Sequence, residues 1–147
     1  MIITKKILTV FITLFIATSL WAINSPNTAD EQTVKNVVTE YAKSIDKQDL
    51  DALENIVYDD ASFIMINKLR NNVSQYDKNE LINLVKKGGM GGWERTLNIV
   101  NVQLSENTAV AKIEIADNKL KTQEFVTLIK VGDKWQIVGS AMSIDKL

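Results

Sequence analysis

The chain has 147 residues, of which 46% are hydrophobic, and a formal net charge of −1 with neither histidine nor cysteine. The absence of both residue types excludes ordinary zinc sites, thiol chemistry, a disulfide framework and attachment of a lipid to cysteine. The mild acidic balance gives no electrostatic reason to expect nucleic acid or an anionic membrane surface as a partner. We expect neither a metal nor a cofactor.

The N-terminus predicts an export signal. Lys5 and Lys6 precede an uncharged, mainly apolar stretch from Ile7 to Leu20, which is the pattern of a secretory signal peptide. Small residues follow, so cleavage is expected after Ala22, with Ser19 as the alternative. A membrane anchor would need roughly 20 mainly apolar residues, and threonines interrupt this run. The sequence therefore predicts a periplasmic or secreted protein with no stable membrane anchor after cleavage.

The remainder is long enough for one domain. Removal of residues 1–22 from the 147 leaves 125, which can enclose a single hydrophobic core. Residues 23–30 are polar and include the only proline, as expected of a flexible lead-in. The chain thus divides into a signal peptide (1–22), a lead-in (23–30) and one folded domain (31–147).

Three helices are predicted in the first part of this domain. Apolar residues three or four positions apart predict a helix from about Glu31 to Lys47. A shorter helix follows Asp49, which can cap it, and ends near Tyr58. A third helix begins after Asp77, which stands three residues before Glu80 as in a capping box.

The rest of the domain predicts a mainly antiparallel sheet. A β-favouring run from Ala61 to Asn67 precedes the third helix, and the four glycines within residues 88–92 mark a flexible loop after it. From Trp93 onward the apolar residues recur at every second position. Four strands joined by hairpin turns are predicted: Trp93–Leu104, Thr108–Ala116, Lys119–Val131 and Lys134–Met142.

The first of these four strands has an irregular pattern. Its apolar phase moves from Leu97 and Ile99 to Val100, Val102 and Leu104. A change of phase within a strand predicts a β-bulge, which bends the strand. A bent sheet can curl around the helices.

Several short motifs resemble the nuclear transport factor 2-like superfamily, which has a cystatin-like α+β cone with an internal pocket. The opening of that fold is matched by Val37–Ile45, Gln48–Leu53 and Tyr58–Ala61, and its last hairpin by Phe125–Val138. The resemblance covers about residues 31 to 145. It implies an α+β domain with three N-terminal helices packed in the concave face of a curved, mainly antiparallel sheet.

Two further segments are most similar to one branch of the superfamily. Gly92–Arg95, leading into a strand, and the helix from Lys78 to Lys87 resemble the branch called "putative lumazine-binding" proteins. That name denotes a presumed small ligand, and a fold alone does not establish function. The resemblance also implies a homodimer, because the sheet commonly pairs two subunits in this superfamily.

Catalysis of the type known in this superfamily is not expected. Ketosteroid isomerases use a tyrosine and a protonated aspartate against the substrate oxygen, and a second aspartate as the base. Tyr41 falls on the tyrosine, whereas the base falls on Met65 and the other acid on or near Phe125. An Asp-Arg-Asp set of the epoxide hydrolase type would need carboxylates around Arg95, and Glu94 would point to the opposite face of a strand.

What remains is an apolar pocket with few polar anchors, the usual form of a small-molecule site. Six residues are candidate ligand contacts: Tyr41, Tyr58, Met65, Trp93, Arg95 and Phe125. Core packing is the alternative for Tyr41, Met65 and Phe125, and a surface salt bridge is the alternative for Arg95. Trp135 is expected to pack in the core or at the sheet interface.

Three functions stay open at this stage. We expect first a noncatalytic domain that binds a small, partly apolar ligand inside the cone. The alternative is a structural or dimerising module that uses the outer face of the sheet, where Lys112, Glu114, Lys121 and Gln123 alternate with apolar positions. An isomerase or dehydratase is the least favoured, because the expected acids are replaced.

Overall fold

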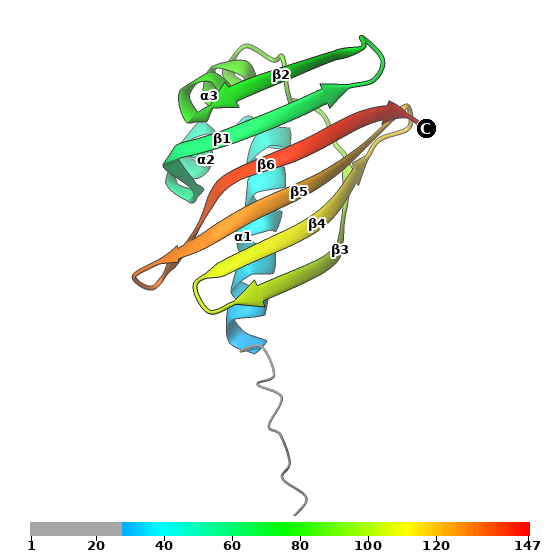
Figure 1. The fold of residues 1–147 in the computed structure, drawn as a ribbon. Helices are drawn as coiled ribbons and strands as arrows, with labels where there is room; N and C mark the ends of the chain where they lie inside the picture. The colour runs from blue at the N-terminus through cyan, green and yellow to red at the C-terminus, as the bar shows by residue number, and fades with distance from the viewer. Residues whose placement is uncertain (1–27) are drawn as a thin grey trace, which may run out of the picture.

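Within residues 28–147, three helices cover one face of a curved six-stranded sheet, and the opposite face carries no helix (Figure 1). The computed structural model describes residues 28–147. The predicted signal peptide, residues 1–22, lies outside this part of the chain. Within residues 28–147, no helix has the length and apolar character needed to cross a membrane.

The helices and strands follow the predicted α+β order. The elements are α1 (Thr28–Lys47), α2 (Leu50–Ile56), β1 (Val57–Asn67), β2 (Asn72–Asp77), α3 (Lys78–Lys86), β3 (Thr96–Ser105), β4 (Thr108–Ala116), β5 (Leu120–Val131) and β6 (Lys134–Lys146). The strand order is β2-β1-β6-β5-β4-β3. Only the β1–β6 pair is parallel among the strand pairs of residues 28–147, which confirms a mainly antiparallel sheet.

Bulges bend the sheet around α1. The β3–β4 register shifts between Ile99 and Asn101, so Val100 is the extra residue that the change of apolar phase predicted. A second shift lies in β6, next to Gly139. A Cβ atom added to Gly139 would lie 2.2 Å from the carbonyl oxygen of Ser62 in β1, so only glycine permits this close approach of the two strands.

Several predicted boundaries were wrong. Residues 28–30, expected in the lead-in, form the first turn of α1, where Asp30 accepts hydrogen bonds from Lys130 and from the indole of Trp135. Tyr58, expected at the end of a helix, belongs to β1. The strand β2 was not predicted, because its residues are exposed or half-buried at the sheet edge and give no apolar pattern. Trp93, expected in a strand, precedes β3.

The predicted helix caps are present. The Asp77 side chain accepts a hydrogen bond from the Glu80 backbone at 2.8 Å, and the Glu80 side chain accepts one from the Asp77 backbone at 2.9 Å. The Asp49 side chain likewise accepts a hydrogen bond from the backbone of Ala52 at 3.1 Å. These bonds satisfy donors that a helix N-terminus otherwise leaves free.

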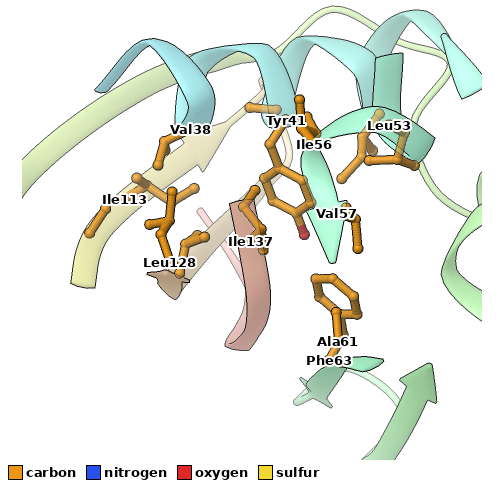
Figure 2. Packing of buried hydrophobic residues seen from close by; sticks show 14 of the residues in the cluster. Val38, Tyr41, Leu53, Ile56, Val57, Ala61, Phe63, Ile113, Leu128 and Ile137 are labelled. Atoms are coloured by element: carbon orange, nitrogen blue, oxygen red, sulfur yellow. The ribbon is translucent and has the colours of Figure 1, made fainter. Parts of the chain in front are cut away.

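The core lies between α1 and the concave face of the sheet. The apolar stripe of α1, including Val34 and Val38, packs with inward-facing residues of the strands such as Ile113 and Leu128. Figure 2 shows the Tyr41 ring extending from α1 into this core, with its hydroxyl oxygen pointing away from the helix. Trp135 is buried in the same core, as expected.

Candidate ligand-binding site

A cavity of about 520 Å³ lies at the end of the concave face where α1 finishes. It is bounded by the last turns of α1, by β1, β2, β4, β5 and β6, and by the loop of residues 88–92. Small-molecule sites usually have volumes of roughly 300 to 1,000 Å³. The cavity is therefore large enough for a compact organic ligand.

A larger hollow of about 820 Å³ lies on the other side of Arg95. Its lining is mostly charged or polar, including Lys43, Lys47, Glu94 and Asp117, and it is a groove on the surface. A ligand there would remain largely in contact with water. The cavity in the concave face is the better candidate, because it combines apolar walls with buried polar groups.

Soft and aromatic side chains form much of the cavity wall. Met65, Met90 and Met142 all line it, together with Tyr76 and Trp93. These are all the methionines of the described residues. Methionine side chains are flexible and polarizable, so they adapt to ligands of different shape.

A buried carboxyl group, that of Glu124 in β5, forms the polar part of the cavity floor. The Glu124 side chain lines the cavity although the residue is only 2% exposed. The hydroxyl of Tyr41 donates a hydrogen bond of 3.0 Å to its Oε1 atom. The Ser140 hydroxyl lies close to the same carboxyl without a hydrogen bond of good geometry. Tyr41 therefore positions Glu124 from behind the cavity.

The surroundings of Glu124 favour its neutral form. Its direct neighbours on the inner face are Ile113 of β4 and Met142 of β6, both apolar. Burial raises the pKa of Glu124 above its ordinary value. Burial, and then the nearby charge of Glu124, raise the pKa of Tyr41 well above its ordinary value. The Tyr41 hydroxyl therefore stays protonated and remains a hydrogen-bond donor.

An ion pair between Arg95 and Asp46 closes one side of the cavity. The Nε atom of Arg95 donates to Oδ1 of Asp46 at 2.6 Å, and a second guanidinium nitrogen contacts the same oxygen. The two side chains are only 12% and 17% exposed. Burial raises the pKa of Asp46, and Arg95 opposes this effect. The guanidinium also lies 5.8 Å from the ring centre of Trp93, a cation–π arrangement.

The glycine-rich loop is tied to the end of α1. The backbone of Gly92 donates a hydrogen bond of 3.0 Å to the carbonyl of Asp46. Gly91 has φ of +77°, and a Cβ atom there would lie 1.8 Å from the carbonyl oxygen of Ile45. Only glycine lets the loop approach the helix so closely. This contact holds Met90 and the neighbouring glycines against the cavity.

The candidate residues predicted from the sequence are only partly brought together. Met65, Trp93 and Arg95 line the cavity, and Tyr41 lies directly behind it. Tyr58, at the start of β1, is not among the lining residues. The Arg95 side chain forms a mostly buried ion pair and still borders the cavity.

The expected place of Phe125 was wrong. Phe125 lies on the outer face of the sheet and is 51% exposed, because the alternation of β5 turns Thr122, Glu124 and Val126 inward. The structure instead turns the carboxyl group of the preceding residue, Glu124, into the interior. Asp46 was missed as well, and its pairing with Arg95 joins residues 49 positions apart in the chain.

The comparisons with known proteins place the chain in a family. Residues 29–142 match the family model described as "Putative lumazine-binding". The chain belongs to this family. Comparison with curated proteins finds no match.

Several solved structures share the fold of this protein. An NTF-2 like protein from Silicibacter pomeroyi is 17% identical, with 80% of this chain and 98% of that chain covered and a TM-score of 0.71. An NTF2-like protein from Shewanella baltica is also 17% identical, with 83% of this chain and 98% of that chain covered and a TM-score of 0.71. A ketosteroid isomerase-like protein from Erwinia carotovora atroseptica is 18% identical, with 79% of this chain and 95% of that chain covered and a TM-score of 0.61. At these identities the similarity establishes the nuclear transport factor 2-like fold alone.

Replacement of the buried carboxyl by an amide should change the pH dependence of stability. Since the pKa of Glu124 is raised above its ordinary value of 4.5, the folded state binds this proton more tightly than the unfolded state. The stability from this group is present below pH 4.5 and is lost as the pH rises through the folded pKa. Glu124→Gln keeps an oxygen for Tyr41 and should therefore become more stable than the wild type toward about pH 8, by on the order of 1 kcal/mol per unit of pKa difference.

The measurement is the free energy of unfolding by urea at about pH 4.5 and about pH 8. Glu106→Gln, at an exposed hairpin turn, is the matched control and should show no comparable gain. A Glu124→Gln variant that is destabilised equally at both pH values would contradict a raised pKa for this buried carboxyl.

Proposed function

We propose that this protein is exported and binds a small, partly apolar ligand in the cavity between the helices and the sheet. The observation that carries the proposal is a cavity of about 520 Å³ whose walls include methionine and aromatic side chains, with a buried carboxyl at its floor. Membership of a family described as lumazine-binding supports a small organic ligand. It does not specify which ligand is bound.

The energy available from such a cavity is sufficient for binding. Burial of about 200 Å² of apolar ligand surface would contribute roughly 5 kcal/mol at about 25 cal/mol per Å². Loss of translational and rotational freedom costs several kcal/mol of this gain. Apolar contact alone therefore supports weak binding, and a polar contact with Glu124 would add both affinity and selectivity.

Binding is favoured over isomerase-type catalysis. Glu124 supplies one carboxyl group, and Met65 occupies the position where the resemblance places the base. A methionine cannot accept a proton, and Asp46 is engaged by Arg95. The cavity thus has one available carboxyl group for chemistry that uses two in the related isomerases.

Blocking the cavity should abolish binding of an uncharged apolar dye. Leu120 lines the cavity, whereas Lys121 is the next residue and pairs with Glu114 on the outer face of the sheet. Leu120→Trp should weaken binding of N-phenyl-1-naphthylamine at least 10-fold, because the indole occupies the cavity. Lys121→Trp should bind like the wild type. Titrations followed by dye fluorescence measure both.

Equal binding by the wild type and Leu120→Trp would overturn the proposed site. Circular dichroism and thermal unfolding of both tryptophan variants verify that the fold is retained. A wild-type protein that binds no dye would contradict the proposed ligand-binding function itself.

Export rests on residues 1–22, where two lysines precede an apolar stretch. We expect the protein in the periplasm or the external medium, and its mature chain to begin at Ile23. Intact-mass measurement of the protein purified from its own host tests this. A mass that includes Met1 and the following residues would refute the proposed export.

The outer face of the sheet supports a second, compatible role in dimer formation. Ile64, Ile66 and Phe125 are 41%, 43% and 51% exposed and point away from the helices. Ile64 pairs with Ala141 of β6, which pairs with Phe125 of β5, so these side chains form one continuous row. Exposed apolar patches of this kind mark protein interfaces. We propose that two copies associate through this face.

A charge placed in this row should separate the subunits. Phe125→Lys should convert a wild-type dimer to a monomer at about 50 µM, because it would bury a second positive charge beside Lys112, which lies over the Phe125 ring. Val131→Lys, at the end of the same strand and 49% exposed, is the matched control and should remain dimeric. Light scattering measures the mass of each variant. A wild-type monomer at this concentration would contradict the dimer.

A further inference from the structure

The Glu124 carboxyl has no cationic partner within the described residues. Tyr41 donates one hydrogen bond to Oε1, and none of the ion pairs formed by residues 28–147 includes Glu124. A buried carboxylate without a positive partner is costly. A ligand that supplies such a partner would therefore gain more at this position than an apolar contact provides.

The arginines at the cavity do not fill this role. Arg95 lowers the pKa of Glu124 through its charge, but its guanidinium is paired with Asp46 and forms no ion pair with Glu124. Arg70 lies on the exposed turn between β1 and β2, at the rim of the cavity. Water screens a charge at that position. The floor of the cavity is therefore the site of an unpaired acid.

The cavity walls are also suited to a cation. Tyr76 and Trp93 present aromatic rings, and the three methionines present polarizable sulfur atoms. Aromatic rings attract organic cations, and thioethers accommodate irregular apolar bodies. Thr122, one inward position from Glu124 and 7% exposed, adds a hydroxyl to the same floor.

We propose that the ligand carries a cationic nitrogen, an ammonium or amidinium group on an apolar body, which binds the Glu124 carboxylate. This inference rests on the proposed ligand-binding function. The N–H groups of the ligand donate to the carboxylate while Tyr41 keeps its own bond to Oε1. Because burial raises the pKa of Glu124 in the empty cavity, a bound cation lowers that pKa again and favours release of the carboxyl proton.

An anionic ligand is disfavoured by the same geometry. Its charged group would either meet Glu124 at the floor or have to displace Asp46 from Arg95. Besides Arg95, the groups nearest Glu124 are the neutral Tyr41 and Ser140 hydroxyls and the apolar side chains of Ile113 and Met142. None of these neighbours supplies a positive charge.

Three probes of the same shape and different charge test the proposal. They are 2-naphthylmethylamine, 2-naphthylmethanol and 2-naphthoate, each used at about pH 7 to displace N-phenyl-1-naphthylamine from the wild type. We expect the amine to bind at least 10-fold more tightly than the alcohol, and the carboxylate to bind most weakly. Glu124→Gln should reduce the preference for the amine to less than about 3-fold while binding of the alcohol changes little.

Glu94→Gln, which removes a negative charge from the neighbouring surface groove, is the matched control and should keep the preference for the amine. Calorimetry of the wild type in two buffers with different ionisation enthalpies should detect more proton release with the amine than with the alcohol. An unchanged preference in Glu124→Gln, or equal displacement by amine and alcohol, would overturn the inference. Displacement by the alcohol alone would overturn it too, and would leave the ligand-binding function intact. A wild type that binds no dye would contradict that function instead.

Discussion

The rest of the structure depends on how α1 is held in the concave face of the sheet. At its first turn, Asp30 accepts hydrogen bonds from Lys130 at 2.8 Å and from Trp135 at 3.1 Å. Near its last turn, Asp46 pairs with Arg95. Between these two contacts, the apolar residues on one side of α1 pack into the concave face of the sheet. Because the helix ends before the sheet does, the far end of the concave face is left open as the cavity.

Much of this architecture could be predicted from the sequence, because local patterns encode it. The stripe of α1, the Asp77 cap and the bulge at Val100 each follow from residues that lie close together in the chain. The strand β2 could not be recognised, since an edge strand that buries little has no apolar period. The pairing of Asp46 with Arg95 depends on packing between distant segments, which a single sequence does not reveal.

The failure to predict Glu124 as a buried residue has a more specific cause. Both faces of β5 contain polar and apolar residues, so burial preference alone selects Phe125 over Glu124 for the interior. The register of the β4–β5 hairpin shows which residues of β5 face inward. Residues opposite each other in an antiparallel pair share a face, and Ile113, which is plainly an inward residue, lies opposite Glu124. The strand register can therefore identify a buried polar residue where hydrophobicity predicts that its apolar neighbour is buried instead.

The position of β6 has a consequence for the order of assembly. β6 is the last strand in sequence, yet it lies in the interior of the sheet between β1 and β5 and makes the parallel pair with β1 (Figure 1). The β1–β2 hairpin cannot become part of one sheet with the β3–β5 meander until residues 134–146 have been synthesised. Long-range pairing of this kind delays folding. The sheet of a nascent chain built in this way stays divided until the C-terminal strand emerges, which fits the proposed export.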